Sequence, residues 1–116
     1  MPSKITGKKL ETEIMREICD WLALQKFFFW RQNNVPVFDK GHFRAMPKYT
    51  PRGLPDIIIL YQGHLITLEV KVPDYWKYTD DQKKMRDRII ENGGGYHLVT
   101  SLEQAQGVLS FYTAKV

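Results

Sequence analysis

The sequence predicts an α/β fold in which α-helices flank a central mixed β-sheet. With 116 residues, of which 43% are hydrophobic, the chain is long enough for one compact core and too short for two. We therefore expect one domain over residues 1–116. The spacing of apolar residues switches between helical and strand periods along the chain. The resulting order is helix, strands, helix, strand and helix, which is typical of an α/β sandwich.

The first helix is expected over residues 10–24, LETEIMREICDWLAL. Four apolar residues share one of its faces at helical spacing: Ile14, Met15, Ile18 and Leu22. Glu11 falls in the middle of this apolar stripe, whereas Glu13 lies away from it. Glu11 is therefore the acid of this helix that we expect to point toward the interior.

Two strands and a long irregular stretch are expected next. Residues 26–31, KFFFWR, have the composition of a strand. Residues 32–53 are rich in proline, glycine, asparagine and basic residues, and they carry a weak signal for an outer hairpin around residues 39–41. Residues 56–61, DIIILY, are apolar on both faces, which is typical of a strand at the centre of a sheet.

The strand over residues 64–72, HLITLEVKV, has two different faces. Alternation places four aliphatic residues on one face: Ile66, Leu68, Val70 and Val72. The opposite face carries Leu65, Thr67, Glu69 and Lys71. We expect the first face to pack in the core and the second to carry the chemistry.

A second helix is expected from Thr79 to about Asn92, because Thr79 and Gln82 have the spacing of a capping box. Three glycines at residues 93–95 end this helix. Residues 96–100, YHLVT, form a further strand, and a last helix begins after Ser101.

Charged residues in the two adjacent strands suggest a site. A tight turn at Gln62-Gly63 places Asp56 opposite Glu69, and directly opposed Cβ atoms are roughly 5 Å apart. Two carboxylates at that separation repel each other unless they share a divalent cation. Lys71 projects from the same face as Glu69. Such a centre suits metal-assisted phosphodiester hydrolysis, with Mg²⁺ as the hard cation. The E-x-K pattern taken alone would also fit a strand face that is simply solvated.

Several motifs resemble the PD-(D/E)xK nuclease superfamily. They are GLPD at residues 53–56, EVK at residues 69–71 and the helix that bears Gln82. Within that superfamily the chain is most similar to the virus-type replication-repair nuclease (VRR-Nuc) domain in its small stand-alone form. The similarity extends from the helix that begins near Glu11, through RQN at residues 31–33, to GGGYHLVTSLEQA.

The resemblance implies a restriction-endonuclease-like fold and cleavage of DNA that depends on Mg²⁺ or Mn²⁺. It also implies a homodimer that cuts branched DNA such as four-way (Holliday) junctions. The implied metal ligands are Asp56, Glu69, the N-terminal acid Glu11 and the backbone carbonyl of Val70. The other implied site residues are Lys71 as the catalytic lysine and Gln82 as the motif glutamine. Glu13 is an alternative to Glu11, and the helix cap alone would explain Gln82.

The composition is compatible with a DNA partner. The formal net charge is +4 and the isoelectric point is near 9.2, which favours a polyanion without proving one. Arg31, Arg44 and Arg52 lie in or beside the irregular stretch and are expected to contact DNA phosphates.

The single cysteine, Cys19, excludes an internal disulfide. No apolar run is long enough to span a bilayer and no signal peptide is evident, so we expect no membrane association and a location in the cytoplasm. The small stand-alone format suggests a viral or prophage origin, in which case this would be the cytoplasm of the host cell.

The sequence is also compatible with two other functions. One is a basic DNA-binding module that has kept the nuclease scaffold without turnover, although such a module would not need the Asp, Glu and Lys. The other is a nuclease for linear, nicked or single-stranded DNA, which the sequence does not separate from a junction nuclease.

Overall fold

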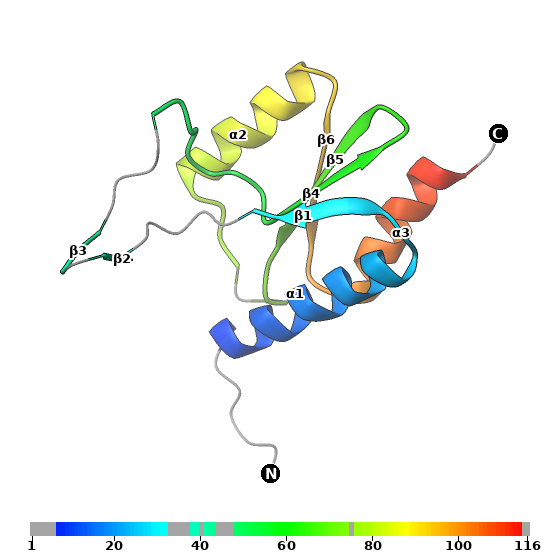
Figure 1. Cartoon of the computed structure of the whole chain (residues 1–116), viewed down its shortest axis with the longest axis horizontal. Coiled ribbons are helices and arrows are strands. Elements are labelled where there is room, and N and C mark those ends of the chain that lie inside the picture. The colour runs from blue at the N-terminus through cyan, green and yellow to red at the C-terminus, as the bar shows by residue number, and fades with distance from the viewer. Residues whose placement is uncertain (1–6, 33–37, 40, 44–47, 75, 115–116) are drawn as a thin grey trace, which may run out of the picture.

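A computed structural model describes the chain except for residues 1–6, 33–37, 40, 44–47, 75 and 115–116 (Figure 1). The elements are α1 (Gly7–Leu24), β1 (Phe28–Arg31), β2 (Phe38–Asp39), β3 (His42–Phe43), β4 (Ile57–Tyr61), β5 (His64–Val70), α2 (Asp80–Glu91), β6 (Gly95–Val99) and α3 (Leu102–Thr113). No helix in the described ranges is both long enough and apolar enough to cross a membrane.

The main sheet has four strands in the order β1-β4-β5-β6. The first three are antiparallel neighbours, whereas β6 runs parallel to β5. Helices α1 and α3 pack together on one face of the sheet, and α2 lies beside β6 on the other (Figure 1). The predicted α/β fold with a central mixed sheet flanked by helices is confirmed.

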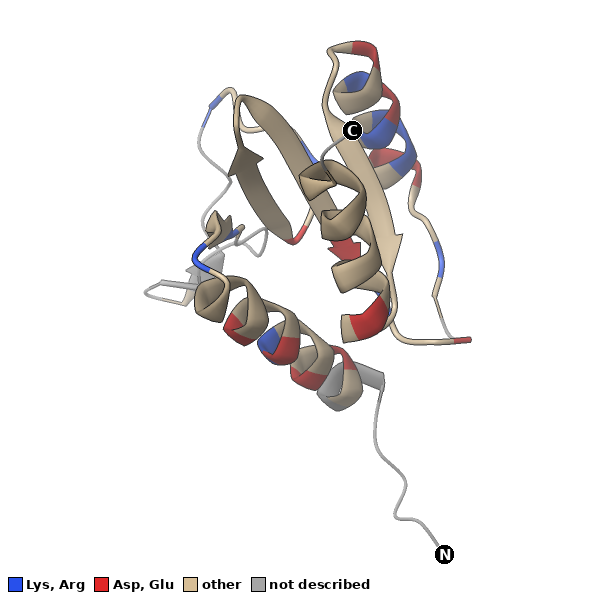
Figure 2. Cartoon of the chain, turned by 90° about the vertical axis from the view of Figure 1, so that its right-hand side faces the viewer, with Lys and Arg blue, Asp and Glu red and all other residues tan. Residues whose placement is uncertain are grey.

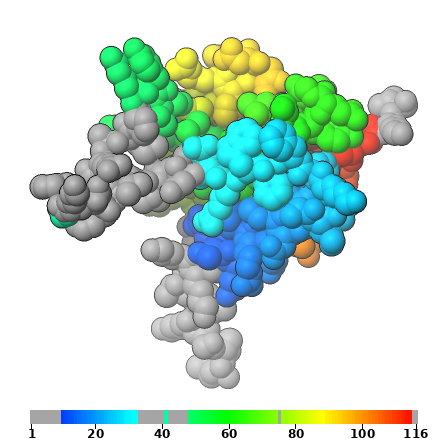
Figure 3. Space-filling view, viewed as in Figure 1, coloured from blue at the N-terminus to red at the C-terminus, as the bar shows by residue number. Residues whose placement is uncertain are grey.

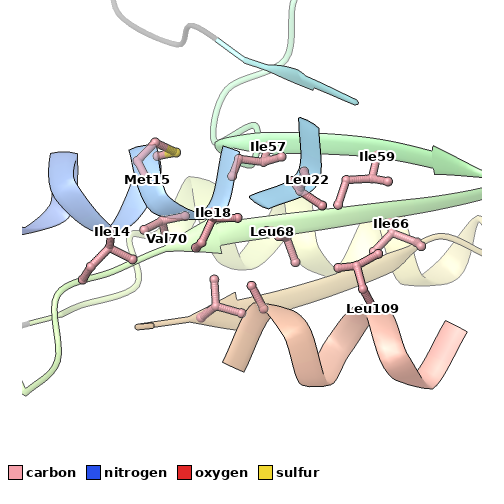
Figure 4. Close-up of a cluster of buried hydrophobic side chains, with 12 residues drawn as sticks. Ile14, Met15, Ile18, Leu22, Ile57, Ile59, Ile66, Leu68, Val70 and Leu109 are labelled. Carbon is pink, nitrogen blue, oxygen red and sulfur yellow. The ribbon is translucent and has the colours of Figure 1, made fainter. Parts of the chain in front are cut away.

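The core lies between the sheet and the helices α1 and α3 (Figure 4). The apolar face predicted for the first helix is buried there, with Ile18 and Leu22 fully excluded from solvent. These side chains meet Ile57 and Ile59 of β4 and the predicted core face of β5, and Leu109 of α3 closes the other side. Burying one such aliphatic side chain contributes roughly 1.5–3 kcal/mol, so this layer supplies much of the stability that holds the site.

The register of the β4–β5 hairpin is the one expected from the turn. Gln62 and Gly63 both have positive φ, at 48° and 83°, which matches the right-handed twist of the flanking strands. Tyr61 pairs with His64, and Ile57 pairs with Leu68. One residue further along, this register brings Asp56 opposite Glu69.

Several element boundaries differ from the sequence-based expectation. Helix α1 begins at Gly7 rather than at residue 10. Strand β1 begins at Phe28 because Lys26, at φ 64°, and Phe27 bond back to the last turn of α1. Asp56 lies just before β4 and Lys71 just after β5. Both side chains therefore stand at one end of the sheet.

The expected outer hairpin is present within the described residues. Phe38 pairs with Phe43 and Asp39 with His42, as the short strands β2 and β3. These strands form a separate two-stranded sheet. The remainder of the predicted hairpin falls partly outside the described residues.

Candidate active site

Asp56 is held at the entrance to β4 by three hydrogen bonds. Its backbone N–H donates to the carbonyl of Leu68 over 3.1 Å, and its carbonyl accepts from the N–H of Gln32 over 2.8 Å. Its side-chain Oδ2 accepts from the N–H of Val70 over 2.8 Å. The carboxylate is thus tied directly to the strand segment that carries Glu69.

Glu69, Lys71 and Gln82 form one connected polar group. Lys71 Nζ donates to Gln82 Oε1 over 3.1 Å, and Gln82 Nε2 donates to Glu69 Oε1 over 2.9 Å. Lys71 Nζ also lies 3.6 Å from Glu69 Oε1. The Glu69 side chain is only 4% exposed and that of Lys71 16%, so these contacts form largely away from water, where they are stronger.

Gln82 caps α2, as the sequence predicts, and its side chain also contacts two candidate site residues. It completes a capping box, because Gln82 Oε1 accepts from the N–H of Thr79 over 3.0 Å and Thr79 Oγ1 accepts from the N–H of Gln82 over 3.1 Å. The same amide reaches Glu69 and Lys71. The start of α2 and the charged end of β5 are therefore locked to each other through one side chain.

Glu11 approaches this group from α1. It is half-buried, and its pKa is raised by burial and by the charge of Asp56, with Lys71 and Arg31 opposing the rise. These interactions place its carboxylate within electrostatic range of the site. Residues two apart on a helix do not share a face, so Glu13 points elsewhere, and the expectation for Glu11 is the one that the geometry favours.

The two central carboxylates are short of positive charge. Burial raises the pKa of Asp56, although the hydrogen bond from Val70 and the charge of Lys71 oppose this rise. Burial and the charge of Asp56 raise the pKa of Glu69 to about 8. In addition, Glu69 Oε2 is buried and accepts no hydrogen bond. An uncompensated buried carboxylate is costly, and a bound cation would compensate it.

The donor set fits a hard divalent cation. Asp56 and Glu69 offer carboxylate oxygens, the ligands that Mg²⁺ and Mn²⁺ prefer. Among the described residues, no group of three or more His, Cys, Asp and Glu side chains could hold a metal ion alone. An ion here would therefore take further ligands from a backbone carbonyl such as that of Val70, from water and from a substrate phosphate, as Mg²⁺ usually does.

Comparisons with known proteins agree with this architecture. No protein-family model and no functionally curated protein matches the chain by sequence. Among solved structures, one described as "VRR_NUC domain" superposes with a TM-score of 0.62 at 16% identity, over 89% of this chain and 97% of its own. Another, "VRR_NUC domain protein", gives 0.57 at 18% identity, over 88% and 86%.

The chain has the VRR-Nuc fold. The fold expected from the motif resemblance is therefore confirmed.

Gly53 explains how the GLPD loop of this VRR-Nuc fold meets α2. Its φ is +76°, and a Cβ atom there would lie 2.5 Å from the carbonyl oxygen of Asp81 and 2.8 Å from the nitrogen of Gln82. Both contacts are with backbone atoms, which cannot rotate away. Glycine at this position lets the loop that leads to Asp56 lie directly against the helix start that carries Gln82.

Gly53→Ala is expected to destabilise the protein by about 1–3 kcal/mol, because it combines an overpacked contact with a disfavoured φ. The substitution should also reduce any activity of the site, because the added methyl group pushes the loop that leads to Asp56 away from the start of α2. Urea unfolding of Gly53→Ala beside Gly63→Ala would check this. Gly63 also has positive φ, but a Cβ there meets nothing within 4 Å, so a similar loss in both variants would contradict the role of the close contact.

The basic residues predicted to contact DNA are only partly described. Arg31 is exposed at the end of β1, and its charge lowers the pKa of Glu11 and of Asp56, so it lies near the site. Arg52 is exposed beside Gly53. Arg44 lies outside the described residues. On α2, Lys and Arg alternate with acids (Figure 2), which is typical of a solvated helix.

Tyr96 is a neighbour of the site that the sequence analysis did not identify. It lies on β6 with only 8% of its surface exposed, and burial together with the charge of Glu69 raises its pKa. Its ring contacts that of Tyr78, which in turn meets Trp76. The parallel pairing of β6 with β5 brings Tyr96 here, and no local pattern in YHLVT signals that pairing.

Proposed function

We propose that this protein is a metal-dependent nuclease that hydrolyses phosphodiester bonds in DNA. One observation carries the proposal: the buried carboxylate of Glu69 and the half-buried carboxylate of Asp56 stand beside the ammonium group of Lys71, and one oxygen of Glu69 has no partner. The VRR-Nuc fold supports a nuclease-type chemistry for the same residues.

In the proposed mechanism Asp56, Glu69 and the Val70 carbonyl would hold the ion. When bound, Mg²⁺ or Mn²⁺ supplies Lewis-acid polarisation of the phosphate and a more acidic water. Lys71 orients the attacking water and stabilises the negative charge that develops on the phosphate.

The remaining site residues support this core. Gln82 fixes the Lys71 ammonium and the Glu69 carboxylate relative to each other through its two hydrogen bonds. Glu11 adds a further acidic group at the edge of the site. In this position its carboxylate can accept a hydrogen bond from a bound water. Arg31 and Arg52 bind the phosphates on either side of the cleaved bond, which gives affinity without reading sequence.

We further propose that the protein acts as a homodimer on branched DNA such as a four-way junction. The dimer is supported by apolar side chains that are exposed at the edge of the sheet, where a second copy of the chain could bind. Leu24 is 76% exposed, Phe28 63% and Trp30 43%, and β1 with the end of α1 forms a continuous surface (Figure 3). Such a cluster on an edge strand is a typical protein interface. Two active sites can then cut two strands of one junction.

A cleavage assay tests the proposal. Purified protein is incubated with a labelled four-way junction and with a linear duplex of the same arm sequence, in Mg²⁺, Mn²⁺ or EDTA. Paired nicks near the branch point on opposite strands, absent in EDTA, are expected. Equal cutting of the linear duplex would contradict junction selectivity. Binding of the junction without cutting in any metal would overturn the nuclease assignment in favour of a DNA-binding module.

A further inference from the structure

Two buried side-chain atoms in the described part of the chain have no hydrogen-bond partner, and both belong to the region of the active site. They are Glu69 Oε2 and Tyr96 Oη. Buried polar groups are nearly always paired, since an unpaired one loses its contacts with water and gains nothing in return. One of these atoms is a hydrogen-bond acceptor and the other can donate, so their needs are complementary.

Strand pairing brings the two side chains to the same face of the sheet. Thr67 pairs with Tyr96 and Glu69 with Leu98 in the parallel β5–β6 ladder. Because side chains alternate along a strand, Tyr96 shares the face of Thr67 and Glu69. Thr67 is not available to the phenol as a donor, since its Oγ1 donates to the carbonyl of Gly95 over 2.8 Å.

The electrostatics of Tyr96 agree with this placement. Burial raises its pKa first, followed by the charges of Glu69, Tyr78 and Asp56, while Arg86 lowers it. The phenol therefore lies within electrostatic range of both carboxylates. No direct hydrogen bond joins Tyr96 to Glu69 in this structure.

The ring of Tyr96 is held by packing rather than by its hydroxyl. Its centroid is 6.4 Å from that of Tyr78, and Tyr78 lies 5.4 Å from Trp76 in an edge-to-face contact. The guanidinium of Arg86 lies over the ring of Tyr78, 5.4 Å from its centroid. Removing the hydroxyl would leave these contacts in place, so the ring does not need the oxygen for its position.

We propose that Tyr96 is a positioning residue for Glu69. When a bound cation keeps Glu69 ionised, the Tyr96 hydroxyl donates a hydrogen bond to Oε2, directly or through one water, and fixes the orientation of that carboxylate. Groups that orient metal ligands in this way contribute measurably to metal affinity. The inference rests on the proposed metal-dependent function and adds a residue to it.

The test compares Tyr96→Phe with Tyr112→Phe. Mn²⁺ binding is followed without DNA by electron paramagnetic resonance of free Mn²⁺, and thermal unfolding is followed in EDTA. Tyr96→Phe is expected to raise the Mn²⁺ Kd by about 10-fold, with an unchanged or higher Tm, because the removed hydroxyl has no partner. Tyr112 provides the matched control, because its hydroxyl is bonded to His97 Nε2 over 2.7 Å. Tyr112→Phe should lower the Tm and leave the Mn²⁺ Kd unchanged.

Each other outcome overturns the inference. A Mn²⁺ Kd for Tyr96→Phe equal to that of the wild type would show that the hydroxyl does not act on Glu69. A Tm that falls together with the affinity would assign Tyr96 a purely structural role. Asp56→Asn separates the inference from the proposed function: if the wild type binds Mn²⁺ and Asp56→Asn does not, the metal site stands whatever Tyr96→Phe does. A wild type that binds no Mn²⁺ would overturn both.

Discussion

Lys71→Ala is expected to reduce DNA cleavage by about 10²–10³-fold, the usual loss when a group that stabilises transition-state charge is removed. The Lys71 ammonium group donates to Gln82 over 3.1 Å and lies 3.6 Å from Glu69. These contacts fix its position, so a mobile surface lysine cannot take its place. The loss should appear in kcat, because in the proposed mechanism this group acts at the chemical step rather than in binding. Single-turnover cleavage of a junction in Mg²⁺ measures it.

The matched control is Lys84→Ala, which removes the same charge from an exposed position on α2. Both variants should bind junction DNA in EDTA within a few-fold of the wild type, as measured by fluorescence anisotropy. Only Lys71→Ala should lose cleavage. If Lys71→Ala cuts at the wild-type rate, the catalytic centre lies elsewhere in the chain.

Local rules were sufficient to predict much of the fold and the centre of the site. The helical spacing of Ile14, Ile18 and Leu22 predicted the buried face of α1, and the turn at Gln62-Gly63 predicted the β4–β5 register. These are short-range features, since each depends on residues adjacent in sequence or joined by a two-residue turn. They were enough to bring Asp56 opposite Glu69.

Long-range packing determined what the sequence analysis missed. The parallel pairing of β6 with β5 is made through the α2 crossover, and no turn sets its register, so Tyr96 was not expected beside Glu69. The burial of the face of β5 predicted to carry the chemistry also depends on this packing, with Glu69 only 3% exposed and Thr67 fully buried. Similarly, the capping box of Gln82 was visible in the sequence, but its bonds to Glu69 and Lys71 depend on where α2 packs.

Glu69→Gln is expected to abolish metal-dependent cleavage and yet stabilise the metal-free protein at alkaline pH. Burial and Asp56 raise the pKa of Glu69 from 4.5 to about 8 in the folded state. The folded protein therefore binds this proton more tightly than the unfolded chain does, and its stability falls as the pH rises from about 4.5 to about 8. Glutamine carries no charge at any pH, can still accept from Gln82, and removes the repulsion with Asp56.

The size of the effect follows from the same linkage. One unit of pKa difference corresponds to about 1.4 kcal/mol, so at about pH 9 the gain is on the order of a few kcal/mol, or at least about 5 °C in Tm for a domain of this size. Below the unfolded-state pKa the carboxyl is protonated in both states, so the gain should vanish. Thermal unfolding in EDTA over this pH range measures it, with Glu17→Gln on the exposed face of α1 as the control.

Addition of Mn²⁺ connects this stability to function. An ion that binds the folded state alone raises its stability by mass action, so Mn²⁺ should restore the Tm that the wild type loses at alkaline pH, and should leave Glu69→Gln nearly unchanged. The wild type would then be less stable than its variant without the ion because the carboxylates are arranged to receive one, a cost typical of active sites. A Glu69→Gln variant that gains nothing at alkaline pH would mean that the carboxylate pair is already compensated within the chain, and the main physical argument for a cation at this site would be lost.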